Sequence, residues 1–284
     1  IYPVKDLNYY LENTAADYYV DGKNLPGYWA GVAAKSLGLF GDIEIEGYTN
    51  LMEGFSPDGT KALVQNAGGL HAPAYDLTFS APKSVSIIWA VDEKGEIKQA
   101  HEKAVKSALR FIEKKAAFTR RNSKGKTVEQ LPGLLAALFT HFESRAEDMQ
   151  LHTHCLVLNV AQRNDLSWGA IESRQLYQWM MASGAVYRAE LANNLRELGI
   201  GIEADGDSFK VAGVPDYLCR VFSKRTQEIS KSLKALGATT SASAIGDHVK
   251  TYTRTKKSDT PISLLRKKWQ YELNESGFSQ EQIA

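Results

Sequence analysis

Alternation of apolar and polar residues predicts the strands of a sheet. Residues 75–81, "YDLTFSA", alternate and stop at Pro82, as a strand with two different faces does. The polar side chains of this strand share one face, namely those of Asp76, Thr78 and Ser80. The apolar runs "LLAALFTHF" and "LHTHCLVLNV" predict two further strands in the core.

The sequence predicts two long helices. Residues 96–117 carry apolar positions at helical spacing, and a second helix should cover residues 173–198 and stop at Gly199. Turn residues between short alternating runs indicate two hairpins, "FTRRNSKGKTVEQ" and "IGIEADGDSFKVAG".

The two ends of the chain have less regular patterns. "DLNYYLENTAADYYVDG" predicts short helical turns with an interruption. From residue 216 onward the pattern is helical, broken by "GATTSASAIGD" and resumed in "SLLRKKWQYELNESG". Because strands, hairpins and helices interleave, we expect an α+β fold with a mostly antiparallel central sheet covered by helices.

Length and composition are those of an ordinary globular protein. The 284 residues, 43% of them hydrophobic, suffice for a core in one large domain or two small ones. No apolar run approaches the roughly 18 residues of a membrane helix, so we expect neither membrane insertion nor secretion. Cys155 and Cys219 are too few for a disulfide framework, which fits a reducing cytoplasm. Because the chain begins at Ile1, we expect a fragment of a longer protein.

Basic charge is concentrated late in the chain. Residues 1–60 carry three Lys and Arg against nine Asp and Glu, whereas residues 218–268 carry twelve against three. Such a run is either a solvated helical face or a surface that binds a polyanion.

Three histidines form a candidate metal site. On a strand, His152 and His154 point to the same face, with side chains about 7 Å apart. An antiparallel return from the preceding strand would bring His141 alongside them. Three imidazoles suit zinc, manganese, copper or nickel better than magnesium. The alternative is a pair of partly exposed histidines with no ligand.

Asp76 is a candidate partner of this site, since it starts a strand and faces as Thr78 does. A carboxylate beside a ligating histidine fixes the tautomer of the ring. It could equally accept a proton from an attacking hydroxyl. As an isolated residue at a strand end, Asp76 would be an ordinary cap.

Two tyrosine doublets lie within eleven residues near the start: Tyr9, Tyr10, Tyr18 and Tyr19. They suit aromatic packing against a sheet. A phenol is also a competent nucleophile toward phosphorus when a cation lowers its pKa or a base takes its proton. Beside a metal that neutralises a phosphodiester, a tyrosine suggests covalent phosphoryl transfer.

These motifs together resemble a known family. The doublets, then "YDLTFSAPKSVSIIWA", then "HFESRAEDMQLHTHCLVLNVAQ", are similar in kind and order to the relaxase domain of MobF-class conjugative relaxases, in the HUH endonuclease superfamily. The likeness runs along essentially the whole chain. It implies a palm-like sheet and a transesterase that nicks and rejoins one DNA strand at a plasmid origin of transfer through a 5′-phosphotyrosine intermediate.

The resemblance also implies roles for individual residues. Tyr9 matches the first nucleophile, Tyr18 the second, and Asp76 the aspartate that contacts a ligand histidine and helps to deprotonate tyrosine. Tyr10 and Tyr19 would pack or assist. One divalent ion, magnesium, manganese or zinc, would be held by three ligands: His141, His152 and His154.

Residues 216–284 would form a basic helical segment that closes over single-stranded DNA, attached to a catalytic core over residues 1–215. The candidate phosphate contacts in this segment are Lys224, Arg225, Arg254, Lys256 and Lys257. Further candidates are Arg120, Arg121 and Lys126 in the "RRNSKGK" hairpin and Arg145 near the metal strand. Binding by such contacts weakens with salt.

Two features depart from the family pattern. Members usually have a short strand before the first doublet, whereas only eight residues precede Tyr9; if that strand is missing, the sheet would have an unfilled edge. Members also continue into a helicase region, and nothing in this sequence resembles a Walker A loop.

The resemblance implies a monomer in the bacterial cytoplasm, transferred with DNA to the recipient cell. Its partners would be single-stranded and hairpin DNA of the transfer origin, accessory relaxosome proteins and a coupling protein. Three alternatives stay open: a rolling-circle replication initiator, a metal-dependent phosphodiesterase that uses water, and a DNA-binding module with a structural metal.

Overall fold

The computed structural model consists of two compact units. The first unit comprises Ile1–Ser80, Ala100–His141 and His152–Asn194, and the second comprises Ala81–Gln99, Phe142–Leu151 and Leu195–Ala284. The structure describes residues 2–4, 24–121, 127–237, 249 and 260–278. No described helix is both long and apolar enough to cross a membrane. The functional boundary expected after residue 215 stays a prediction.

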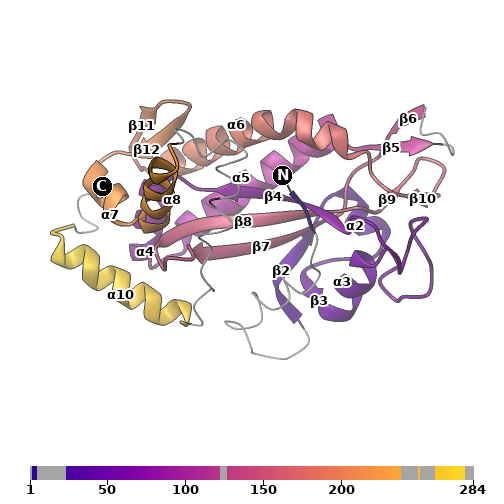
Figure 1. The fold of residues 1–284 in the computed structure, drawn as a ribbon, viewed down its shortest axis with the longest axis horizontal. Helices are drawn as coiled ribbons and strands as arrows, with labels where there is room; N and C mark the ends of the chain where they lie inside the picture. The colour runs from indigo at the N-terminus through magenta and orange to yellow at the C-terminus, as the bar shows by residue number, and fades with distance from the viewer. Residues whose placement is uncertain (1, 5–23, 122–126, 238–248, 250–259, 279–284) are drawn as a thin grey trace. The chain divides into compact units, whose positions relative to one another are not determined.

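A six-stranded sheet organises the first unit (Figure 1). The strand pairs whose register is defined run antiparallel, and the α+β fold class is confirmed. In spatial order its strands are β1 (Tyr2–Pro3), β4 (Ala74–Ser80), β8 (Met149–Leu158), β7 (Ala136–Glu143), β2 (Asn24–Ala30) and β3 (Asp42–Glu44). The strands predicted at "YDLTFSA", "LLAALFTHF" and "LHTHCLVLNV" correspond to β4, β7 and β8.

The edge strand β1 answers the question that the short stretch before Tyr9 raises. Tyr2 pairs with Asp76 and Pro3 with Tyr75, so the edge of β4 is filled and the short strand before the first tyrosine doublet is present. The N–H of Val4 donates to the carbonyl of Ala74 at 2.9 Å, which continues the pairing by one residue. Proline is tolerated there because an edge strand needs hydrogen bonds on one side only.

Two long helices cover one face of the sheet (Figure 1). They are α5 (Glu96–Ala116) and α6 (Ser173–Glu197), and both were predicted from the sequence. Alternation along β4 turns its apolar residues toward them, so the Phe79 ring lies 5.4 Å from that of Tyr187 on α6. Gly199, with φ +81°, lies just after α6, as the stop signal predicts.

Shorter elements cover part of the opposite face. Helices α2 (Val32–Ser36) and α3 (Ile45–Met52) belong to a core that includes Leu156 of β8 and Phe139 of β7. The ring of Tyr48 on α3 meets that of Phe139 edge to face at 5.8 Å.

Small hairpins complete the first unit. The predicted hairpin at "FTRRNSKGKTVEQ" is formed by β5 (Phe118–Arg121) and β6 (Thr127–Gln130), which pair antiparallel. Its predicted turn lies outside the described residues. A second pair, β9 (Ala161–Gln162) and β10 (Trp168–Gly169), follows β8.

The second unit is mainly helical around α4 (Lys83–Val91). The predicted hairpin of β11 (Ile202–Asp205) and β12 (Ser208–Val211) is confirmed. It joins α4 through a hydrogen bond from the Val211 N–H to Ser84 Oγ at 3.0 Å. The remaining described helices are α7 (Asp216–Val221), α8 (Lys224–Ala235) and α10 (Ile262–Glu275). The helical turns predicted near the start and nearly all of the predicted break after α8 lie outside the described residues.

Candidate metal and phosphoryl-transfer site

Strand β8 presents two histidines on the sheet face opposite α5 and α6. Its intervening residue, Thr153, is fully buried, whereas His152 and His154 are only partly buried. The antiparallel register with β4 pairs Thr78 with His154 and Ser80 with His152. The polar face of β4 and the histidine face of β8 therefore form one surface, because paired residues share a face.

His141 on β7 joins the two histidines of β8. The His141 ring centroid lies 5.4 Å from that of His152 and 5.3 Å from that of His154, and the two rings of β8 are 5.2 Å apart. The predicted antiparallel return of the chain thus brings all three rings together.

Asp76 holds His154 from the neighbouring strand. The Asp76 side chain is buried, and its Oδ2 accepts a hydrogen bond from His154 Nδ1 at 2.8 Å. Thr78 Oγ1 donates to Asp76 Oδ1 at 3.2 Å and lies 3.3 Å from the same ring nitrogen. Since a carboxylate only accepts, the proton is on Nδ1, and the lone pair of the neutral ring is on Nε2.

The donor set fits a divalent transition metal. Imidazole nitrogens about 2.1 Å from an ion at tetrahedral angles put ring centroids roughly 5.3 Å apart, close to the spacing observed. As they stand, however, no three or more His, Cys, Asp or Glu side chains in the described part of the chain are arranged to hold an ion. The spacing of the three ring centroids nevertheless matches that of three imidazoles around one ion.

A buried phenol lies in the core near this site. Tyr48 is fully buried, and its hydroxyl has no hydrogen-bond partner among the described residues. Burial raises the pKa of Tyr48 well above its usual value, and the negative charge of Asp76 raises it further. A phenol that resists ionisation is a poor nucleophile, so Tyr48 serves the core.

Several predicted site residues lie outside the part of the chain that the structure describes. They are Tyr9, Tyr10, Tyr18, Tyr19, Lys126, Arg254, Lys256 and Lys257. Their roles stay predictions.

The two predicted DNA contacts at the start of the β5–β6 hairpin are held by carboxylates. Arg120 forms an ion pair with the buried Glu172. Arg121 binds Glu129 at 2.5 Å and Asp165 at 2.8 Å, and these hydrogen bonds raise its pKa. Each guanidinium thus has a structural partner, and DNA binding by either residue stays a prediction.

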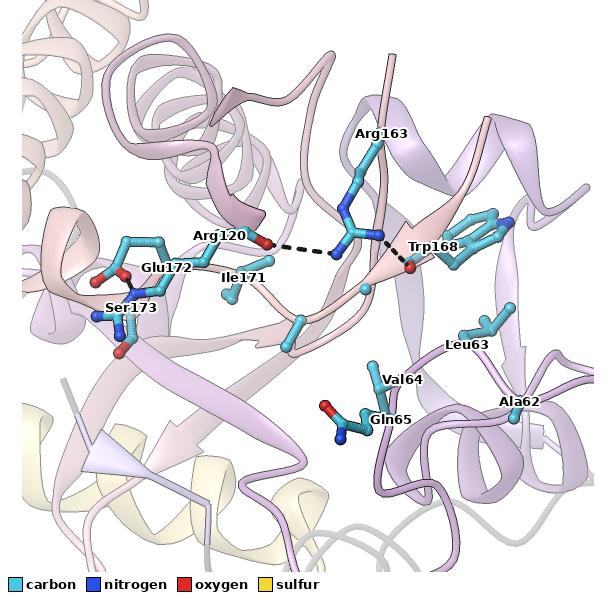
Figure 2. Close-up of a pocket in the computed structure, with 12 residues that line it drawn as sticks. Ala62, Leu63, Val64, Gln65, Arg120, Arg163, Trp168, Ile171, Glu172 and Ser173 are labelled. Carbon is cyan, nitrogen blue, oxygen red and sulfur yellow. Dashed lines mark hydrogen bonds and ion pairs between the residues drawn. The ribbon is translucent and has the colours of Figure 1, made fainter. Parts of the chain in front are cut away.

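Arg120 also lines a pocket of about 690 Å³ (Figure 2). Arg163 reaches into it from beside β9 and donates to the carbonyl of Trp168 at 2.7 Å. Residues 62–65 form the facing wall. No local sequence pattern marks this pocket, because its lining comes from four separate stretches of the chain.

The remaining basic candidates lie in the second unit. Lys224 Nζ lies 3.2 Å from Oδ1 of the buried Asp148, and Arg225 pairs with Glu228 at 3.3 Å. Arg145 is half-buried in the turn between β7 and β8. Contact of these residues with DNA is a prediction that the structure does not test.

Comparisons with known proteins agree with this architecture. The family model described as TrwC relaxase matches residues 4–276. The multifunctional conjugation protein TraI of Escherichia coli (strain K12) is 35% identical over an alignment of 284 positions that covers 95% of this chain. The chain spans 16% of the length of that curated relative.

Two solved structures are similar throughout. The metal-bound structure of the conjugative relaxase TrwC in complex with oriT DNA is 33% identical, with a TM-score of 0.84, and the match covers 95% of this chain and 93% of that one. TrwC complexed with a 27-mer DNA comprising the recognition hairpin and the cleavage site is 32% identical, with a TM-score of 0.81, over 89% and 92% of the two chains.

Proposed function

Because the chain belongs to the TrwC relaxase family, we propose that it nicks and rejoins one DNA strand at a plasmid origin of transfer. The attacking group is a tyrosine, which leaves a 3′ hydroxyl and stays joined to the 5′ phosphate. The phosphotyrosyl bond retains the energy of the phosphodiester, so the strand can be rejoined. The observation that carries the proposal is the cluster of His141, His152 and His154 with Asp76 bound to its last member.

The three histidines hold one divalent ion. Binding to such an ion neutralises the non-bridging oxygens of the scissile phosphate and aligns it for in-line attack. Three nitrogen ligands favour manganese, zinc or another transition metal over magnesium. A TrwC structure that contains both metal and oriT DNA supports this assignment.

Asp76 orients His154 and keeps Nε2 as its ligating atom. Its hydrogen bonds with His154 Nδ1 and Thr78 Oγ1 hold the carboxylate against the sheet. They support a positioning role over direct proton abstraction from the nucleophile.

Tyr9 makes the first attack and Tyr18 the second, with Tyr10 and Tyr19 as packing neighbours. The position of β1 supports the reach of this segment. Val4 is bonded to Ala74, two residues from Asp76 on β4. The five residues from Val4 to Tyr9 can span up to about 17 Å when extended.

The basic residues Lys224, Arg225, Arg254, Lys256 and Lys257 bind phosphates of the single strand, in a segment over residues 216–284 that covers the DNA. Arg120, Arg121, Lys126 and Arg145 contribute further contacts. The reaction takes place in the bacterial cytoplasm, on a monomer assembled with accessory relaxosome proteins and a coupling protein, and the protein passes to the recipient with the DNA.

The decisive experiment detects the covalent intermediate. Labelled single-stranded oligonucleotides that tile the transfer origin of the plasmid encoding the protein are incubated with it and manganese. We expect a protein–DNA adduct on a denaturing gel, absent with a chelator and absent in Tyr9→Phe. Cleavage without an adduct would instead indicate hydrolysis by water, and binding without cleavage would indicate a DNA-binding module. If only Tyr18→Phe removes the adduct, the assigned order of the nucleophiles is wrong.

A further inference from the structure

A chain of four polar side chains, three buried and the last partly buried, lies on the sheet face opposite the histidine cluster. His101 on α5 is fully buried, with its Nδ1 2.7 Å from the hydroxyl of Tyr187 on α6 and its Nε2 2.8 Å from Thr153 Oγ1. Thr153 Oγ1 lies 2.9 Å from Thr140 Oγ1. We call this chain of four side chains the His101 network: Tyr187, His101, Thr153 and Thr140.

The His101 network touches both strands that carry the histidines. Thr153 lies between His152 and His154 on β8, and Thr140 immediately precedes His141 on β7. Because successive side chains point to opposite faces, the two threonines contact each other directly behind the histidine rings. The N–H of Leu158 on β8 donates to the carbonyl of Leu135 beside β7 at 2.9 Å, and the same strand register places Thr140 opposite Thr153. That register sets His141 opposite His152.

The chemistry of the network favours this single arrangement. A neutral imidazole offers one donor and one acceptor, and each hydroxyl can both donate and accept, so the chain can be satisfied from end to end. A slip of β8 by one residue would turn Thr153 away from His101 and bury the histidines in its place. A fully satisfied buried network therefore specifies register as well as holding the elements together.

We propose that His101 is a positioning residue for the metal site. It acts through Thr153 and Thr140, holding β7 and β8 in the register and spacing that let His141, His152 and His154 share one ion. The inference rests on the proposed function, because it assumes that these histidines bind metal.

The test measures metal affinity directly, without DNA. Cobalt(II) is titrated into chelator-treated protein, and the visible absorption of the bound ion is followed. Thr153→Val removes the hydroxyl at nearly constant volume, and Thr153→Ser keeps it. We expect Thr153→Val to weaken cobalt binding at least about 10-fold and Thr153→Ser to stay within about 3-fold of the parent protein.

A matched control separates positioning from general loss of stability. Thr119 on β5 is also fully buried, and its hydroxyl donates to the Ala170 carbonyl at 2.6 Å. Thr119→Val should lower the thermal unfolding midpoint and leave cobalt affinity unchanged. Tyr187→Phe provides a second test of the network, since it removes only the far hydrogen bond of His101, and we expect a smaller loss of affinity.

Three results would overturn the inference. They are unchanged cobalt affinity in both Thr153→Val and Tyr187→Phe, equal losses in Thr153→Val and Thr153→Ser, or an equal loss in Thr119→Val. If Thr153→Val does not fold, the Tyr187→Phe result decides. A parent protein that binds no cobalt would overturn the proposed metal site and this inference with it, whereas parent binding with unaffected variants overturns this inference alone.

Discussion

The carboxylate of Asp76 and the imidazole of His154 are joined by a 2.8 Å hydrogen bond between neighbouring strands. Asp76 pairs with Leu156 in the sheet register, two residues beyond His154, so the contact is diagonal across one face. It fixes the ring tautomer before any ligand arrives. A ring held in this way loses less side-chain entropy when it binds a metal.

Removal of the Asp76 carboxylate should weaken metal binding. We expect Asp76→Ala to lower cobalt affinity about 10- to 100-fold, because His154 loses the partner that sets its tautomer. Asp76→Asn should lose less, since its amide oxygen still accepts a hydrogen bond. Calorimetric titration checks both, with Ser80→Ala as control, an exposed residue on the same strand face. Wild-type affinity in Asp76→Ala would contradict the assigned role.

Loss of a histidine should separate chemistry from DNA binding. We expect His152→Ala to reduce nicking at least about 100-fold, because the phosphate loses its metal, while affinity for a single-stranded oligonucleotide stays within a few fold. Gel assays of nicking and fluorescence anisotropy measure the two. Chelator treatment of the parent protein should give the same pattern. Near-normal nicking in His152→Ala would rule out the histidine site.

The histidine cluster was predictable because it follows from the period of a strand and from a short chain reversal. The two-residue period of a strand puts His152 and His154 on one face, and a short antiparallel return brings His141 to them. The long helices were predictable for a similar reason, since α5 and α6 each bury one stripe. Gly199 marked the end of α6 because a left-handed residue terminates a helix.

Other features were not visible in local patterns. Residues 84–90 of α4 are buried on all sides, so the segment shows no amphipathic period. Strand β1 is two residues long and leaves no period to detect. His101 lies on the buried stripe of α5, four residues after Ile97 and three before Ala104, which is a signal in retrospect. Its partners, however, are 52 and 86 residues away in sequence.

A buried lysine in the second unit should make stability depend on pH. Burial lowers the pKa of Lys83 from 10.5 to about 8, and its Nζ donates to the Met149 carbonyl at 2.5 Å. Between about pH 8 and pH 10.5, Lys83 is protonated in the unfolded chain and largely deprotonated in the folded one. Stability contributed by this group therefore rises as pH increases from about 8 toward 10.5.

Comparison with Lys83→Met isolates this effect. From pH 7.5 to 9.5, the free energy of unfolding of the parent protein should rise by about 2 kcal/mol relative to that of Lys83→Met. Urea titrations at several pH values measure the difference. Parallel pH profiles for the two proteins would show that Lys83 titrates normally.

Glu113 should be important for the junction of β2, α2 and β7. Its Oε1 accepts hydrogen bonds from the N–H groups of Val32 at 2.7 Å and Leu134 at 3.0 Å. We expect Glu113→Ala to lower the free energy of unfolding by about 1–3 kcal/mol, because two backbone donors lose their acceptor. Glu113→Gln should lose less.

Urea unfolding measures these losses, with Lys114→Ala as an exposed neighbouring control. If Glu113→Ala and Lys114→Ala are equally stable, water satisfies both donors and the junction does not depend on the carboxylate.

The two-sided character of β4 and β8 restricts how related sequences can change in length. Deletion or insertion of one residue within either strand would exchange the face that packs against α5 and α6 for the face that carries Asp76 or the histidines. In β4, Phe79 would turn away from Tyr187 and Asp76 would turn toward it. Gains and losses of residues should therefore accumulate in turns between the strands. Natural relatives that differ in length should keep a constant count from Asp76 to Ser80 and from His152 to Leu158.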